Sequence, residues 1–324
     1  SGRNNLILGT SRAGRGIDPD HPALHGDKFY NFATPGSRPA LDRHKLEAAL
    51  AKNKVESVIF FVDFFPFNSF ASLPENFVES FVDRLPTKDS ALRSPAYLLQ
   101  VLEDFSNYFW SYQSLWDSVK TMRQQREAET NKLHYTTLHD NGRWDVNYSP
   151  DRQTLQAFRQ LEASYLNSNW FPAADPRFSL NEPEAAPNKA FAEFRKILEI
   201  AQSHDIELTL IMLPVHARLL ENLDYAGLWQ HFEAWKKRIV ELNEAVAISA
   251  GSEPFNVWDF NGYYPMSIEM VAPDTKLHDL HWMYDSGHIN KVAGDRILEI
   301  VFGQAEHSFG GKISAGNIDA WLLK

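Results

Sequence analysis

The sequence predicts an α/β protein with a doubly wound, mainly parallel sheet of five strands and a helical insertion. Five short apolar runs are continuous rather than alternating, as in strands that are buried on both faces. Helical patterns separate most of these runs, and this alternation is typical of a sheet covered by helices on both sides. Residues 64–187 break the alternation. We therefore expect a single α/β domain over residues 1–324, with a mainly helical insertion at 64–187.

The expected elements follow the chain in order. The predicted strands are the apolar runs at residues 5–8, 29–33, 57–62, 207–213 and 255–260. The predicted helices have apolar residues three or four positions apart and cover residues 41–51, 189–203, 225–250 and 291–302. Gly251 is expected to end the third of these helices, because glycine readily adopts the left-handed conformation that follows a helix.

The insertion carries its own helical signals. Apolar side chains at helical spacing predict one helix, and they are Leu102, Phe105, Phe109, Tyr112, Trp116 and Val119. A second helix is expected to begin at Ser149-Pro150, because proline is favoured at the first helical position, and to continue through Tyr165. We interpret the many aromatic residues as core. Residues 171–187, rich in Pro, Ala and Asn, are the best linker candidate.

Composition excludes several classes of function. The chain has no cysteine, which removes disulfides, zinc–thiolate sites, Fe–S clusters and cysteine nucleophiles. Its 32 basic and 42 acidic residues give a net charge of −10, which argues against a nucleic-acid partner. No run approaches the roughly 18 apolar residues needed to span a bilayer. A strand-like run follows Ser1-Gly2 almost at once, so we expect that a natural N-terminal segment has been removed.

Polar residues follow the predicted strands at the edge where ligands bind in an open α/β sheet. They form five groups, at residues 9–12, 34–37, 63–68, 214–216 and 285–290.

The first group, Gly9-Thr10-Ser11-Arg12, permits several interpretations. A phosphate loop would need Lys and then Ser or Thr after its second glycine, and Arg15-Gly16 stand there instead. A nucleophile elbow, G-x-S-x-G, would need glycine where Ala13 stands. A serine displayed on a strand-to-helix turn, with a distant base, is the third interpretation. Ser11 could also simply cap a helix.

Asp285 and His288 favour the third interpretation. They lie three positions apart, just before the last predicted helix. A serine hydroxyl is a weak nucleophile until a base accepts its proton, and the base needs an acceptor that fixes its tautomer. Ser11, His288 and Asp285 are the residue types that this chemistry requires.

The arrangement resembles the SGNH hydrolase superfamily, also called GDSL-like. The similar elements are a serine after the first strand, a glycine after the second, and D-x-x-H near the C-terminus. The resemblance implies a flavodoxin-like, SGNH-type sheet, with Ser11 as nucleophile, His288 as base and Asp285 as its acid. It also implies an oxyanion hole built from the N–H groups of Ser11 and Gly36. No cofactor is implied.

Two positions depart from the family pattern. Thr10 stands where members with the G-D-S motif have aspartate. The third block of the family offers an asparagine side chain to the oxyanion, but here Asp63 lies nearest that position. An ionised carboxylate there would repel an oxyanion. Asn68 is the remaining candidate for the oxyanion hole, provided that its loop folds back.

The turn G-T-S-R with D-S-G-H-I-N resembles one branch more closely. This branch comprises the membrane-anchored, periplasmic SGNH-like proteins of polysaccharide O-acetylation, such as the alginate O-acetylation proteins, and DltD. It implies a serine esterase or O-acyltransferase that acts on acyl esters, in particular acetyl esters, of a cell-surface carbohydrate polymer. It further implies a membrane-bound O-acyltransferase partner and a periplasmic location with an N-terminal anchor.

Other polar residues are candidates for the substrate cleft, namely Arg12, Asp63, His216, His281, Trp282 and Asn290. Two alternative functions stay open. One is a catalytically impaired glycan-binding or scaffold component of a polysaccharide modification complex, which the unusual Asp63 favours. The other is a metal-dependent hydrolase that uses His278, His281 and His288 with nearby carboxylates, although H-x2-H is a poor spacing for one helix face.

Overall fold

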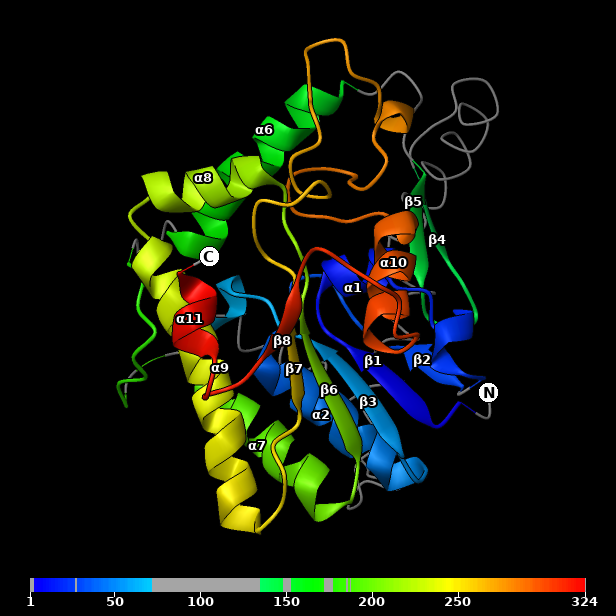
Figure 1. Ribbon diagram of the computed structural model, residues 1–324, viewed down its shortest axis with the longest axis vertical. Coiled ribbons are helices and arrows are strands. Elements are labelled where there is room, and N and C mark those ends of the chain that lie inside the picture. The colour runs from blue at the N-terminus through cyan, green and yellow to red at the C-terminus, as the bar shows by residue number, and fades with distance from the viewer. Residues whose placement is uncertain are drawn as a thin grey trace, which may run out of the picture.

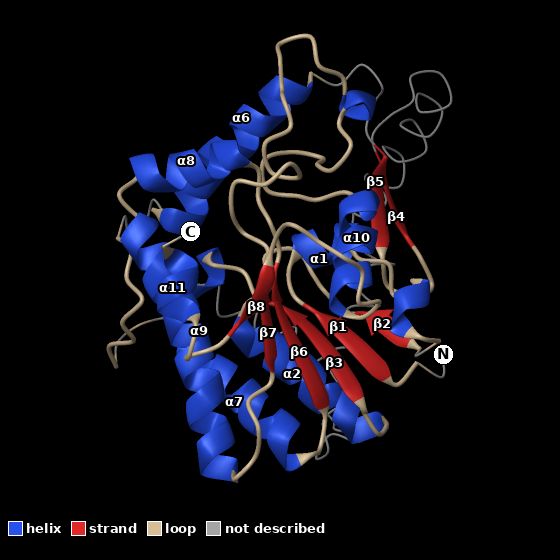
Figure 2. Ribbon diagram, in the orientation of Figure 1, coloured by secondary structure: helices blue, strands red, loops and turns tan. Residues whose placement is uncertain are grey.

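The computed structural model describes residues 3–26, 28–71, 135–147, 153–171, 177–184, 186 and 188–323. The helix predicted from Leu102 to Val119 and the helix start predicted at Ser149-Pro150 lie outside the described residues, as does part of the linker candidate. The described chain is α/β, with a mostly parallel central sheet flanked by helices (Figure 1; Figure 2).

The central sheet has six strands in the order β2-β1-β3-β6-β7-β8. The strands are β1 (Asn5–Leu8), β2 (Phe29–Asn31), β3 (Ser57–Phe61), β6 (Glu207–Met212), β7 (Asn256–Asp259) and β8 (Gly311–Ile313). The strands from β2 to β7 in this order are parallel, and their order is compatible with a flavodoxin-like fold. All five predicted strands are present.

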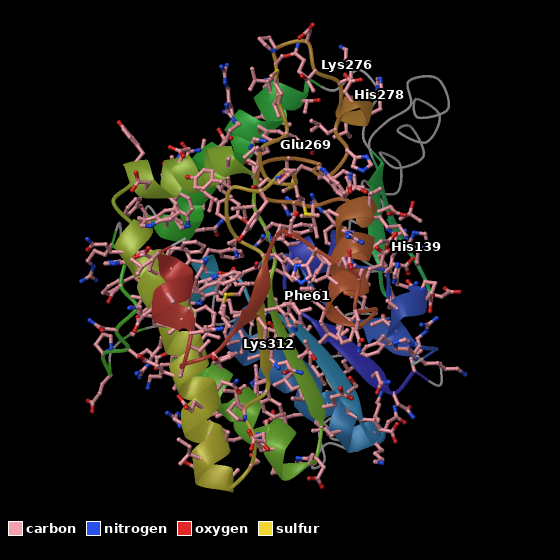
Figure 3. All side chains as sticks on the ribbon, viewed as in Figure 1. Phe61, His139, Glu269, Lys276, His278 and Lys312 are labelled. Atoms are coloured by element: carbon pink, nitrogen blue, oxygen red, sulfur yellow. The ribbon has the colours of Figure 1, made fainter. Side chains whose placement is uncertain are left out.

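The prediction of five strands is one short, because β8 adds an antiparallel strand beside β7. This strand has only three residues, and its central Lys312 is exposed (Figure 3). Such a short edge strand lacks the continuous apolar run that reveals a buried strand.

Alternate side chains of the strands enter two separate cores. Leu6 and Leu8 of β1 pack into one core, and Ile7 packs into the other. The same division separates Phe60 from Phe61 in β3. Because both faces are buried, each strand is apolar throughout, which is why the sequence shows continuous runs.

Helices cover both faces of the sheet (Figure 1). On one side lie α2 (Pro39–Lys52), α7 (Ala190–Ser203) and α9 (Trp229–Ala250), whose apolar residues share the core of Leu6. On the other side lie α1 (Ser11–Gly16) and α10 (Lys291–Val301), which share the core of Ile7. The helices α2, α7, α9 and α10 lie within a few residues of their predicted positions.

The helix predicted at residues 225–250 is α9, which begins four residues later than predicted. α8 (Ala217–Tyr225) ends before a turn at Gly227, whose φ is +72°, and α9 follows. Gly251 ends α9 in a left-handed conformation, as predicted. Four further short helices are described outside residues 72–187: η1 (Pro22–Leu24), η2 (Phe65–Phe67), η4 (Leu277–Asp279) and α11 (Ile318–Leu322).

The described part of residues 64–187 contains more than helices. β4 (Tyr135–Leu138) and β5 (Trp144–Asn147) form an antiparallel hairpin, which the sequence analysis did not predict. α6 (Thr154–Ser164) follows, and a wider helical turn, η3 (Tyr165–Trp170), continues it. No helix among the described residues is both long enough and apolar enough to cross a membrane.

The strand order reverses at the carboxyl ends of β1 and β3. The chain passes from β1 outward to β2 and then returns to the other side of β1 to form β3. Ligands of open α/β sheets bind where the strand order reverses in this way. Gly9 leaves β1 here with φ of +139°, and a Cβ on it would lie 2.9 Å from the Phe61 carbonyl oxygen, so only glycine fits this turn.

Candidate active site

Ser11 is the first residue of α1, directly after the turn that leaves β1. Thr10 is the N-cap, because its hydroxyl oxygen accepts a hydrogen bond from the Arg12 N–H at 3.3 Å. Ser11 is therefore not the capping residue. Its side chain is free to act in a different contact.

The structure brings Ser11, His288 and Asp285 together. Ser11 Oγ lies 2.8 Å from His288 Nε2, and His288 Nδ1 lies 2.8 Å and 3.0 Å from the two carboxylate oxygens of Asp285. An ionised carboxylate can only accept, so Nδ1 carries the proton and Nε2 accepts the Ser11 hydroxyl. This is the hydrogen-bonding order of a serine nucleophile, its base and the acid that orients the base.

Asp285 is buried and held by its own loop. One of its oxygens accepts backbone N–H groups from Gly287 at 3.0 Å and from His288 at 2.8 Å. Burial would raise the pKa of the Asp285 carboxyl, but the charge and hydrogen bond of His288, the Gly287 N–H and the charge of Arg15 outweigh it. The pKa therefore lies below its ordinary value of 3.8. An ionised Asp285 can stabilise an imidazolium on His288.

Two glycines fix the distance between Ser11 and His288. A Cβ on Gly294 of α10 would lie 1.8 Å from the carbonyl oxygen of Gly16, the last residue of α1. A Cβ on Gly16 would lie 2.6 Å from the side chain of Ile289, which follows His288. The helix that carries Ser11 therefore packs backbone against backbone on the helix that follows His288.

The N–H groups of Ser11 and Gly36 have no protein acceptor among the described residues. Ser11 N–H belongs to the first turn of α1, where helix N–H groups lack a partner within the helix. Gly36 has φ of +67° in the loop after β2, and a Cβ there would meet no atom within 4 Å. The loop is tied to the first turn, since Thr34 N–H donates to the Gly9 carbonyl at 3.1 Å.

A buried lysine holds the loop that contains Gly36 in place. Lys45 of α2 donates to Thr34 Oγ1 at 2.8 Å, to Ser37 Oγ at 3.0 Å and to Asp42 at 2.9 Å. Lys45, Asp42 and Ser37 are all buried. A buried charge pair with all these partners fixes the residues on either side of Gly36.

Arg12 and Asp63 face each other rather than a ligand. One Arg12 nitrogen donates to Asp63, and the other oxygen of Asp63 accepts from the Thr10 hydroxyl. Arg12 also donates to the carbonyls of Gly287 at 2.9 Å, Leu213 at 2.6 Å and Pro214 at 2.7 Å. We call this cluster the Arg12 staple, because it joins the ends of β1, β3 and β6 to the His288 loop. Both side chains are buried, and the guanidinium compensates the charge of Asp63.

Asn68 is fully buried, and its amide joins its own loop to residues 170–179. Its Nδ2 donates to the carbonyls of Trp170 and Arg177, both at 3.1 Å, and its Oδ1 accepts the N–H groups of Phe70 and Ser179. These bonds use both amide hydrogens, so the expectation that Asn68 supplies an oxyanion donor finds no support in the described contacts.

A cavity of about 290 Å³ opens beside His288. Asp285 and Arg15 line it on one side, and α6 lines the other with Gln160, Leu161 and Ser164. α6 is fixed there by the paired hydrogen bonds of Glu162 with Arg218 of α8, both 2.8 Å. The described part of residues 64–187 thus forms a wall of the candidate site.

Two of the cleft candidates have local structural roles. His216 is the N-cap of α8: its Nδ1 accepts the Arg218 N–H, and its Nε2–H donates to the Glu269 carbonyl at 2.8 Å. Burial lowers the pKa of His216 and keeps the ring neutral, as this bonding requires. Asn290 is the N-cap of α10, and its Nδ2 donates to the His281 carbonyl.

His281 and Trp282 lie on the 276–284 loop, and their rings meet edge to face. The loop is fixed by Glu269, whose carboxylate accepts the N–H groups of His281, Trp282 and Met283. Figure 3 shows Glu269 above the sheet and His278 farther out at the edge of the molecule. Within the described residues, no group of three or more His, Asp or Glu side chains is placed so that it could hold a metal ion.

Sequence reasoning missed Arg15, Lys45 and Glu269. Arg15 lies 3.9 Å from Asp285 and 4.8 Å from the ring centroid of Trp144. The signal for Arg15 was its spacing, four residues after Ser11, which places both on one face of a helix. Lys45 and Glu269 gave no comparable signal, because a charged residue is ordinarily expected to be exposed to solvent.

Comparison with known proteins adds no further evidence: no family model and no curated protein matches the chain.

Proposed function

We propose that this protein is a serine esterase or O-acyltransferase of SGNH type that acts on acetyl or other short acyl esters of a cell-surface carbohydrate polymer. The observation that carries the proposal is the chain of contacts from Ser11 Oγ through His288 to Asp285, with 2.8 Å at each step. It lies at the carboxyl edge of the sheet, beside a cavity that can admit a substrate.

The proposed reaction has two halves. Ser11 Oγ attacks the ester carbonyl while His288 Nε2 accepts its proton, and the N–H groups of Ser11 and Gly36 bind the oxyanion. The carbon–oxygen bond of the ester then breaks, and His288 returns the proton to the departing alcohol. An acyl group stays on Ser11. Water or a sugar hydroxyl next gives its proton to His288 and takes the acyl group, which restores Ser11.

Asp63 does not weigh against this reaction as the sequence alone suggested. The Arg12 guanidinium compensates its charge and holds it in the staple. The oxyanion hole proposed here therefore has two backbone donors and no asparagine side chain. The separation of Ser11 from His288, which is within hydrogen-bond reach, also favours an active enzyme over the impaired scaffold considered above.

The proposal includes the setting that the resemblance implies. The polymer substrate would lie outside the cytoplasm. A membrane-bound O-acyltransferase partner would deliver the acyl group. A periplasmic location with an N-terminal anchor would suit that arrangement.

The test is ester turnover by wild type and by Ser11→Ala. We expect wild type to release acetate from p-nitrophenyl acetate and from acetylated polysaccharide, and Ser11→Ala to be slower by at least about a thousandfold. Ser252→Ala, exposed after α9 and outside the cavity beside His288, serves as the matched control. Equal rates for wild type and Ser11→Ala would overturn the proposal, and mass spectrometry of an acyl adduct on Ser11 would support it.

A further inference from the structure

A second cavity, of about 430 Å³, lies beyond the carboxyl end of β7, and no residue of the Ser11–His288–Asp285 group lines it. Its walls come from α9, from the loop after β7, and from α11, which packs beside α9 (Figure 1). The cavity opens to solvent at Tyr263, whose side chain is half exposed. Its volume falls within the roughly 300–1,000 Å³ of small-molecule sites.

One buried carboxylate fixes three of the side chains that line this cavity. Asp259, at the end of β7, accepts hydrogen bonds from Lys236 Nζ at 2.7 Å, from Trp321 Nε1 at 2.9 Å and from Asn261 Nδ2 at 3.2 Å. Asp259 is fully buried, and its three donors come from three different segments. Because these side chains are already oriented, a ligand would not have to order them.

The charges in the wall disfavour an anionic ligand, and a lysine already occupies the face of one aromatic ring. The Lys236 ammonium lies 4.5 Å from the centroid of the Phe232 ring, so it already occupies the position in which an aromatic ring would attract a cationic ligand. The charge of Lys236 is compensated by Asp259. The Glu233 carboxylate, which also lines the cavity, disfavours an anion.

The remaining wall combines rings with hydrogen-bonding groups. Trp229, Tyr263 and Tyr264 supply aromatic surface, while Glu233 and Asn261 supply polar atoms. Glu233 accepts the Trp229 indole N–H at 3.0 Å through one oxygen, which fixes the ring beside the carboxylate. A ligand with several hydroxyl groups and a flat apolar face suits this wall.

We propose that this cavity binds a neutral pyranose sugar. The C–H face of the sugar would pack on the aromatic rings, and its hydroxyl groups would bond to Glu233 and Asn261. The proposal is independent of ester chemistry, since the cavity shares no residue with the candidate active site. It therefore stands or falls separately from the proposed function.

The test uses ¹⁹F NMR of protein labelled with 5-fluorotryptophan, with the Trp229 and Trp321 signals assigned by Trp→Phe variants. Methyl glucoside, methyl galactoside and methyl mannoside are titrated separately to high millimolar concentration. We expect at least one of them to shift both signals saturably. Glu233→Ala should weaken that binding about tenfold through the lost hydrogen bond. Glu241→Ala, exposed on the same helix and outside the cavity, should leave it unchanged.

Ser11→Ala should bind the same glycoside as wild type, which separates this site from the active site. Choline and inorganic phosphate are titrated in parallel and should shift neither signal saturably. The proposal is overturned if no glycoside shifts the two signals, or if choline or phosphate does. It is also overturned if Glu233→Ala and Tyr263→Ala, both folded by circular dichroism, bind as tightly as wild type.

Discussion

The two residues that would activate Ser11 in the proposed reaction lie far from it in the sequence. Its hydroxyl meets His288, which stands 277 positions later, and Asp285 fixes the imidazole from the other side. The three residue types and the D-x-x-H spacing were sufficient to nominate this group from the sequence. The distances were not, because they depend on the packing of α1 against α10.

Other candidate residues could not be assigned from sequence. Asn68, His216 and Asn290 are polar residues at the carboxyl edge of the sheet, where a ligand-binding role was a reasonable expectation. In the structure each of them bonds to backbone groups of its own surroundings. Capping and substrate binding use the same residue types, so only the neighbouring atoms distinguish them.

Asp285→Asn should lower kcat for ester hydrolysis by about 10²–10⁴-fold, because asparagine can stabilise the wrong tautomer of His288 and carries no charge to balance an imidazolium. KM should change little, since Asp285 does not bind the substrate directly in the proposed reaction. Steady-state kinetics with p-nitrophenyl acetate measures both values. A variant with unchanged kcat would contradict the proposed role of Asp285.

The same carboxylate should make stability depend on pH. Its pKa is lower in the folded protein than the ordinary value of 3.8, so the ionised form stabilises the fold. This stabilisation is fully present above about pH 3.8 and is lost as the pH falls through the lower, folded pKa. In urea unfolding, the stability gap between wild type and Asp285→Asn should therefore narrow on acidification. A gap that stays constant would contradict this assignment.

At the scale of elements, long and regular segments were predictable and short ones were not. The five parallel strands and the helices α2, α7 and α10 follow their apolar patterns closely. β8 has three residues, and α1 has six with two glycines, so neither carries a readable pattern. α9 begins at Trp229 rather than at the predicted Tyr225 because the turn at Gly227 comes between them, and α8, before that turn, was not predicted.

Gly294→Ala tests the close contact between α10 and α1. Its Cβ would lie 1.8 Å from a backbone oxygen, so the two helices must separate. We expect the variant to lose about 2–3 kcal/mol of unfolding free energy, measured in urea, and most of its esterase activity. Gly316→Ala is the control, because its Cβ would lie 3.8 Å from the nearest atom, the Ser314 hydroxyl oxygen. Equal stability of the two variants would contradict the proposed packing role.

His216 links the start of α8 to the loop at Glu269, and it does so as a neutral ring. Burial lowers its pKa below the ordinary value of 6.5. The stability that the neutral ring contributes is fully present above about pH 6.5 and is lost as the pH falls through the lowered pKa. His216→Asn keeps a capping oxygen but cannot titrate, so its urea stability should vary less than that of wild type over this range. Parallel curves for the two proteins would contradict the role of His216.

At the scale of the whole molecule, the Arg12 staple joins segments that the fold brings together from across the chain. Arg12 and Thr10 come from the first turn, Asp63 from the end of β3, and Leu213 and Gly287 from much later. Buried charges of this kind are costly to leave unpaired. The staple therefore contributes to stability and to the position of the His288 loop at once.

Arg12→Gln should lower the unfolding free energy by about 3–5 kcal/mol, because it leaves the Asp63 carboxylate buried without its partner. Adding Asp63→Asn should recover part of that loss, since the unpaired charge is then removed. Urea unfolding of the two single variants and the double variant measures the coupling. A double variant that is less stable than Arg12→Gln alone would contradict the pairing.

The contact between Gly16 and Gly294 also has a consequence for biosynthesis. Residue 11 leaves the ribosome long before residue 288, and at roughly 5–20 residues per second the interval of 277 residues takes about 15–55 s. Throughout that interval the serine has no imidazole beside it. In the nascent chain Ser11 therefore lacks its proposed base until α10 docks against α1.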